Sequence, residues 1–110
     1  METFINIIRK KNPITPIVVV SRVKYLFDEL DQDKGIRREE IRQFQVKLVE
    51  RLSKTDSHIY YVDGRKLFGE DYDEYTVDSI HPNDYGFMVL ANNLLKELKL
   101  IFNKEENKNE

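Results

Sequence analysis

The sequence predicts an α/β protein with a short parallel sheet, and three observations support this class. Helical and strand patterns alternate along the chain, in the order helix, strand, helix, strand, helix. The run PIVVV at 16–20 is continuously apolar and mostly β-branched, which is typical of a strand buried on both faces of a parallel sheet. A helical pattern at 37–53 separates this run from a second strand, HIYYV at 58–62. Alternation of this kind indicates parallel strands joined by crossover helices.

The first part of the chain predicts one helix, one strand and a long loop. Residues 2–11 carry apolar side chains at helical spacing and end in basic residues, which favour a helix C-terminus, and Pro13 stops that helix. After the first strand, residues 21–36 are polar and mixed, with Gly35 as a break. This segment predicts a surface loop with a short helical piece around Tyr25–Leu30.

The second part predicts two amphipathic helices around the second strand. The helix at 37–53 has one apolar stripe, formed by Ile41, Phe44, Leu48 and Leu52. Residues 65–81 are expected to be mostly loop, with Leu67 and Phe68 as an anchor in the core. The final helix is expected at 83–102, capped by Asn83, and its predicted buried face consists of Phe87, Leu90, Ala91, Leu94, Leu98 and Ile101.

The predicted sheet is too small for a complete domain. Residues 1–103 form one domain part, and residues 104–110 form a polar tail that we expect to fray. Only two convincing strands occur, and a two-stranded sheet is marginal by itself. Either the chain pairs with a second copy, or further strands of the sheet lie outside it.

Composition excludes several classes of protein. The 110 residues have a net charge of −2, with 35% charged side chains, so no nucleic-acid footprint is indicated. There is no cysteine, which excludes disulfides and thiolate metal sites. The longest apolar run, Ile17–Val20, is too short to span a membrane. The N-terminus lacks the order of a signal peptide, so we expect a cytoplasmic protein as written, and a secreted one if an N-terminal segment is missing.

The segment TVDSIHPNDYGF at 76–87 carries the residues best suited to catalysis. Asp78 precedes His81 by three residues on a loop that follows the last strand and leads into a helix. A catalytic histidine needs a partner that fixes its tautomer and stabilises the imidazolium form, and an acid at this spacing can reach Nδ1. The alternative for the isolated pattern is structural, with Asp78 capping a turn and His81 packing against the last helix.

The wider segment resembles a known family. YTVDSIHPNDYGFMVLANNL closely resembles the last conserved block of the GDSL-like (SGNH) serine hydrolases, in which the triad's Asp and His share one loop before the C-terminal helix. FINIIRKKNPITPIVVVSRVKY is similar to an earlier helix and strand of that family, and HIYYVDGRKLFGEDYDEYTVD to its last strand. The resemblance covers roughly residues 3–102. Ser79, at a position where the family often has another small residue, is a mild departure.

The resemblance implies a fold, an activity and a missing part. The fold would be three-layered α/β/α and flavodoxin-like, present here as its C-terminal half. The activity would be ester hydrolysis on acyl or acetyl esters of carbohydrate or lipid, without metal or organic cofactor. His81 would take the serine's proton and Asp78 would orient His81. The family's G-D-S block and its oxyanion-hole glycine and asparagine do not occur in this sequence.

Other candidate residues are weaker. Ser21 follows the first strand but lacks flanking glycines, and Ser79 would have difficulty reaching its neighbour's Nε2. The acidic residues at 70–74 lack calcium-loop spacing and predict a solvated loop. His58 has no partner nearby in sequence and is expected to be structural or exposed. Arg22 and Lys24 follow the first strand, where they would line a substrate cleft or a solvated loop, and we favour the loop.

Three functional hypotheses follow. The first is a truncated hydrolase domain that is inactive alone. The second is half of a split enzyme that regains activity with a separate N-terminal chain. The third is a non-catalytic binding or assembly module that dimerises through its open sheet edge.

Overall fold

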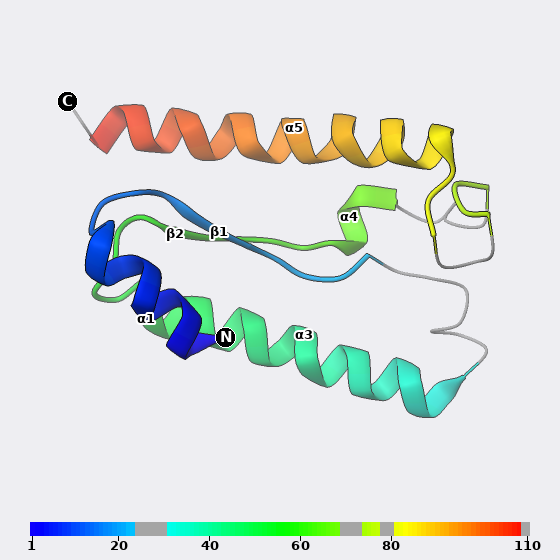
Figure 1. Ribbon diagram of the computed structural model, residues 1–110, viewed down its shortest axis with the longest axis horizontal. Coiled ribbons are helices and arrows are strands. Elements are labelled where there is room, and N and C mark those ends of the chain that lie inside the picture. Colours follow the sequence, from blue (N-terminus) through cyan, green and yellow to red (C-terminus); the bar gives the residue numbers. More distant parts are fainter. Residues whose placement is uncertain (24–30, 69–73, 78–80, 109–110) are drawn as a thin grey trace.

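The computed structural model describes residues 1–23, 31–68, 74–77 and 81–108. Helices and strands alternate along them, as the sequence predicts (Figure 1). The elements are α1 (Glu2–Lys11), β1 (Ile17–Val20), α3 (Gln32–Leu52), β2 (Ile59–Val62), α4 (Arg65–Phe68) and α5 (Asp84–Lys108). The helical piece expected around Tyr25–Leu30 lies outside the described residues.

The two strands form a parallel sheet. Ile17 pairs with Ile59 and Val20 with Val62, so the strands are in register over their full length. The chain passes from one strand to the other through α3, because parallel neighbours need a crossover connection. In the described part of the chain each strand has a neighbour on one side only. The predicted α/β class with a short parallel sheet is therefore confirmed.

Helices cover both faces of the sheet and give three layers. α5 lies along one face, and α1 and α3 lie against the other (Figure 1). Alternate strand residues supply the two cores, because successive side chains of a strand point to opposite faces. The core under α5 contains Val18, Val23, Tyr60, Val62, Leu67, Phe68, Leu90, Leu94, Leu98 and Ile101. The core under α1 and α3 contains Ile5, Ile17, Val19, Leu48, Val49, Leu52, Ile59 and Tyr61.

Two helix boundaries differ from the expected ones. α3 begins at Gln32 and not at 37, because Asp31 caps it by accepting a hydrogen bond from the backbone N of Lys34 (3.2 Å). The helix therefore continues through Gly35. α5 continues to Lys108, so residues 104–108 of the predicted tail are helical and not frayed. Contacts of the last turns of α5 with β2, described below, hold this end in place.

Two predicted buried faces are partly wrong. On α3, Ile41 and Phe44 are 53% and 56% exposed, and the helix buries Gln45, Leu48 and Val49 instead. On α5, Phe87 and Ala91 are exposed, while the later part of the predicted face is buried or half-buried. The reason is that both helices extend beyond the two strands that the described residues form, so their apolar stripes are covered over part of their length.

Candidate active site

His81 lies on a narrow loop immediately before α5. The backbone N of Val77 donates to the carbonyl O of His81 (2.9 Å), and Thr76 and Pro82 form an antiparallel bridge. The side chain of His81 is exposed. Asp78 and Ser79 lie outside the described residues, so the pairing of Asp78 with His81 stays a prediction.

Asn83 fixes this loop to the start of α5. Its Oδ1 accepts a hydrogen bond from the backbone N of Gly86 (2.7 Å), which is the contact expected of a helix cap. Its Nδ2 donates to the carbonyl O of Glu74 (3.0 Å), and its backbone N donates to the carbonyl O of Tyr75 (2.8 Å). The predicted cap is confirmed, and it also ties the two ends of the His81 loop together.

Close packing of the first turn of α5 requires a glycine at position 86, the last residue of the sequence block HPNDYG. A Cβ atom at Gly86 would lie 2.0 Å from the carbonyl O of Tyr75, which is far too close for any side chain. The first turn of α5 therefore approaches the backbone that precedes the His81 loop. Tyr75 also stacks at a tilt between Phe68 and Tyr85, with ring centroids 5.8 Å and 5.3 Å apart.

Replacing Asn83 by alanine is expected to destabilise the chain by about 1–2 kcal/mol, because it removes a helix cap and a loop contact together. Urea unfolding followed by circular dichroism would measure this change. Asn92→Ala is the matched control, since Asn92 is exposed on the same helix. Equal stability of the two variants would contradict the role given to Asn83.

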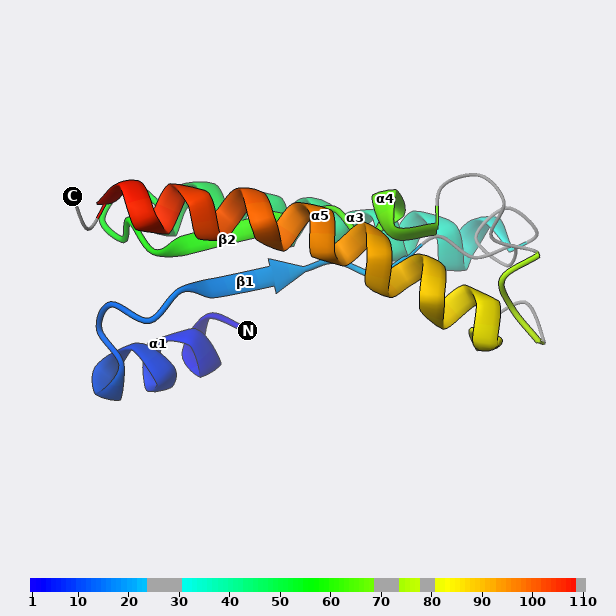
Figure 2. The ribbon, with the colours of Figure 1, turned by 90° about the horizontal axis from the view of Figure 1, so that it is seen from above.

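The His81 loop lies at the carboxyl end of the sheet. β1 points toward the end of the molecule at which α5 begins (Figure 2). In parallel α/β sheets, ligands bind outside the carboxyl ends of the strands. The position of His81 is therefore the one at which catalytic residues of such folds are found.

Ser21 stands at the same sheet edge but is only 3% exposed. Its Oγ accepts hydrogen bonds from the hydroxyl of Tyr61 and from the backbone N of Gly64, both at 2.8 Å. These contacts join the ends of β1 and β2. The hydroxyl of Ser21 is therefore buried and already hydrogen-bonded within the fold. Ser53 and Ser57 follow α3, on the side of the sheet where the strands begin.

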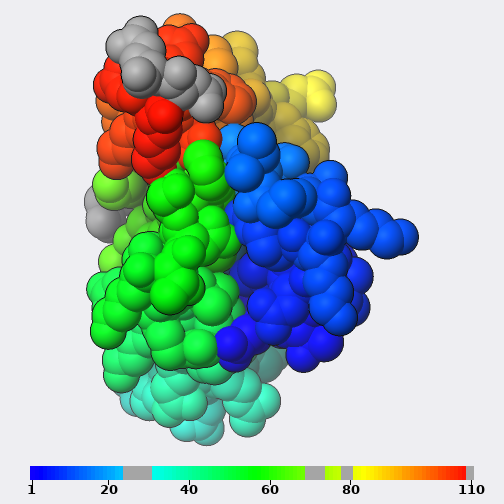
Figure 3. All heavy atoms as spheres, turned by 90° about the vertical axis from the view of Figure 1, so that its left-hand side faces the viewer, coloured from blue at the N-terminus to red at the C-terminus, as the bar shows by residue number. Residues whose placement is uncertain are grey.

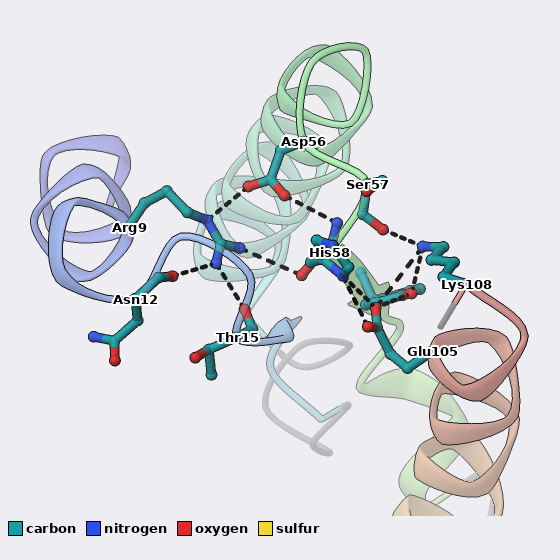
Figure 4. Close-up of polar contacts among 9 residues, drawn as sticks. Arg9, Asn12, Thr15, Asp56, Ser57, His58, Glu105 and Lys108 are labelled. Atoms are coloured by element: carbon teal, nitrogen blue, oxygen red, sulfur yellow. Dashed lines mark hydrogen bonds and ion pairs between the residues drawn. The ribbon is translucent and has the colours of Figure 1, made fainter. Parts of the chain in front are cut away.

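A cluster of polar side chains lies at the other end of the sheet, where β2 begins (Figure 4). His58 Nδ1 lies 2.8 Å from Glu105 Oε2 on α5, and the hydroxyl of Tyr60 donates to the same carboxylate. Lys108 Nζ donates to the hydroxyl of Tyr60 (2.7 Å). His58 was expected to be structural or exposed, and it is half-buried with Glu105 as its partner. This partner lies 47 residues away and could not be found from local sequence.

The same end also anchors α1. Arg9 Nε donates to Asp56 Oδ2 (2.9 Å), and Asp56 Oδ1 accepts from the backbone N of His58 (2.9 Å). Arg9 Nη1 donates to the carbonyl O atoms of Asn12 and Thr15, both at 2.7 Å. In Figure 3 the last turns of α5 lie against the segment around the start of β2, with α1 and the following loop beside them. Side chains therefore join three elements at this end.

The Glu105 carboxyl, 12% exposed, has a pKa held below its usual value. The main cause is the hydrogen bond from Tyr60, followed by that from His58. Burial and the nearby carboxylate raise the pKa of Tyr60. A carboxyl with a lowered pKa stabilises the fold above its unfolded value of about 4.5, and this contribution is lost as the pH falls through the lower folded value.

We therefore expect Glu105→Gln to be less stable than the unmodified chain at pH 6, with a difference that shrinks as the pH falls from about 5 to 3. Urea unfolding at several pH values would measure it. Glu106→Gln is the matched control, because Glu106 is exposed on the same helix turn. A difference that grows on acidification would contradict the assignment.

The described residues contain no group of three His, Asp or Glu side chains that could hold a metal ion. The acidic residues at 70–73 lie outside them, and Glu74 is exposed. Among the same residues, no helix is long and apolar enough to cross a bilayer.

Fold and site together define a class of protein: a three-layer α/β chain with a histidine-bearing loop at the carboxyl end of its sheet. The profile of the GDSL-like Lipase/Acylhydrolase family matches residues 1–99, and the chain belongs to this family. The resemblance read from the sequence is therefore confirmed. No curated protein matches the chain.

Two solved structures are similar to the chain. One is a salicylyl-acyltransferase from a tetracycline biosynthetic pathway, with a TM-score of 0.77 and 32% identity over 89% of this chain. The other, from Bacteroides ovatus, is described as a GDSL-like lipase, with a TM-score of 0.73 and 27% identity over 91% of this chain. In both cases the match covers 30% of the other protein. The chain thus spans less than a third of the length of these relatives.

Proposed function

We propose that this chain supplies the acid and the histidine of a Ser-His-Asp triad in an ester hydrolase, whose serine and oxyanion donors come from another polypeptide segment. The observation that carries this proposal is the position of His81, on a capped loop at the carboxyl end of the sheet in a chain of this family. Asp78, three residues earlier, is the proposed partner of His81.

The proposed chemistry follows from these roles. His81 accepts the proton of the serine as that residue attacks the ester carbonyl, and then gives it to the leaving alcohol. Asp78 holds the imidazole in the required tautomer and stabilises its charged form. Water releases the acyl group in a second step. An acceptor alcohol would release it by the same chemistry, and the similarity to an acyltransferase favours testing both acceptors.

Two structural features support the proposal that another segment completes the domain. In the described residues β1 has a strand on one side only, and apolar side chains such as Ile41 and Phe44 are exposed. A strand this apolar is expected to have neighbours on both edges. The match to less than a third of each related structure agrees with this. We infer that the chain alone is inactive.

The test is intact-mass analysis after incubation with a fluorophosphonate, which labels activated serines. The 110-residue chain alone should form no adduct. When it is mixed with a polypeptide that carries the serine block of the domain, that partner should be labelled, and labelling should be lost with His81→Ala. An adduct on the chain alone would contradict the proposal and would identify a nucleophile within it.

The second candidate function is a non-catalytic module that assembles through the open edge of β1. The unpaired edge and the exposed apolar side chains favour it. Sedimentation analysis separates the two hypotheses. A stable homodimer that neither binds nor activates a serine-bearing segment would favour assembly.

A further inference from the structure

The two outer edges of the sheet differ in shape and in charge. Residues of β2 line a groove of about 400 Å³ between α3 and α5. Three other residues that line this groove are charged: Glu50 on α3, and Glu97 and Lys104 on α5. Natural sheets protect their edges from pairing with a further strand by covering them with helices and by placing charged side chains there. The β2 edge is therefore suited to remain an edge of the complete sheet.

The outer edge of β1 presents backbone groups without a neighbouring strand. The backbone N of Ile17 donates to the carbonyl O of His58 (2.8 Å), so the backbone groups of Ile17 face β2. Successive residues of a strand direct their backbone groups to opposite sides, and those of Val18 and Val20 therefore point away from β2. Among the described residues, no strand pairs with β1 on this side. The side chain of Val20 is also exposed, although it is apolar.

The two flanks of α5 face different edges of the sheet. The helix crosses the sheet at an angle, with its last turns over β2 and its first turns on the β1 side, where α1 also lies (Figure 2). On the β2 flank, Leu100 lines the groove, and the buried Ile101 faces the sheet. Met88, Leu95 and Phe102 are exposed and recur every seven residues, so they form one stripe along the helix. Helical geometry places this stripe on the flank away from the groove.

Exposed apolar groups therefore accumulate on the β1 side of the chain. The β1-side surface consists of the open edge of β1 and the α5 stripe of Met88, Leu95 and Phe102. Phe4 and Ile7 are exposed on α1, the helix that lies on the same side (Figure 2). Large exposed apolar patches in proteins mark interaction sites. An open strand edge with apolar flanks fits a partner that adds a strand and covers the flanks.

We propose that the β1-side surface, and not the β2 groove, binds the polypeptide segment that carries the serine of the hydrolase. A strand of that segment pairs with the backbone groups of Val18 and Val20, and its apolar side chains cover the α5 stripe. This inference rests on the proposed function. The occupant follows from the length of the related proteins, because the match to each covers 30% of it and most of such a protein lies outside this chain.

Cysteine accessibility tests this assignment, because the chain has no cysteine of its own. Leu95→Cys reports on the β1-side surface, and Leu100→Cys in the β2 groove is the matched control, since these leucines are 48% and 58% exposed on one helix. The probe is the rest of the Bacteroides ovatus protein, without the segment that this chain matches. An excess of the probe should slow alkylation by iodoacetamide at least about tenfold at 95 and less than about twofold at 100, as expected when only the first is buried in an interface.

The other outcomes separate this inference from the proposed function. Protection at 100 and not at 95 would overturn the inference. So would protection at neither position while fluorophosphonate labels the probe in a manner that depends on His81, and the proposed function would then stand. Protection at neither position without labelling would overturn both. Protection at 95 on concentrating the chain without the probe would assign the surface to a second copy and overturn the inference. Met88→Cys, on the same stripe, should repeat the result of Leu95→Cys, which excludes a local effect of one substitution.

Discussion

Replacing His81 by alanine is expected to lower kcat of the assembled enzyme by about three to four orders of magnitude, with a small effect on KM. The reason is that the proposed general base would be lost while the oxyanion donors and the substrate contacts remain. The measurement is steady-state hydrolysis of a short-chain acyl ester by this chain together with the segment that carries the serine.

His58→Ala is the matched control for this prediction, because His58 is the other histidine of the chain and lies at the opposite end of the sheet. Its kcat should stay within a few-fold of the original value at a temperature where both variants are folded. Retention of more than a tenth of the activity by His81→Ala would refute the proposed role. Asp78→Asn should also lower kcat strongly, because it would remove the group that sets the histidine tautomer.

Replacing Gly64 by alanine is expected to cost at least about 3 kcal/mol of unfolding free energy and to leave much of the chain unfolded. A Cβ at Gly64 would lie 1.9 Å from the carbonyl O of Ser21 and 2.6 Å from the carbonyl group of Arg22. All of these atoms belong to the backbone, so the movement of a side chain cannot relieve the clash. The added methyl would separate the carboxyl ends of β1 and β2.

Urea unfolding would measure this loss, and Gly35→Ala is the control. Gly35 lies inside α3, where alanine is more favourable than glycine by up to about 1 kcal/mol. The control should therefore be as stable as the original chain or more so. A Gly64→Ala chain that unfolds at the same urea concentration as the original would show that the strand ends can separate without loss of the fold.

The layers of the fold could be predicted because their signals are local. PIVVV predicts a strand from composition alone, and Asn83 predicts a helix start from the chemistry of its side chain. The expected burial of this strand on both faces is only partly correct, because Val19 is buried while Val20 is 40% exposed. The buried faces were predicted less well. Phe44 and Phe87 have the right spacing for a core, but spacing does not say how far the sheet beneath a helix extends.

The candidate site could be predicted only where it is contiguous in sequence. Asp78 and His81 stand in one block, and so they could be proposed together. Glu105 and His58 are 47 residues apart, and their contact depends on how α5 lies along the sheet.

The attachment of Glu105 and Lys108 to the start of β2 has a consequence for folding during synthesis. The core between α1, α3 and the two strands contains only residues up to Tyr61, so it can form while the ribosome is still adding the rest. The core beneath α5 includes Ile101 and is secured by contacts at residues 105 and 108. One face of the sheet must therefore stay uncovered until the last helix emerges, and this is the interval in which the nascent chain most needs a chaperone.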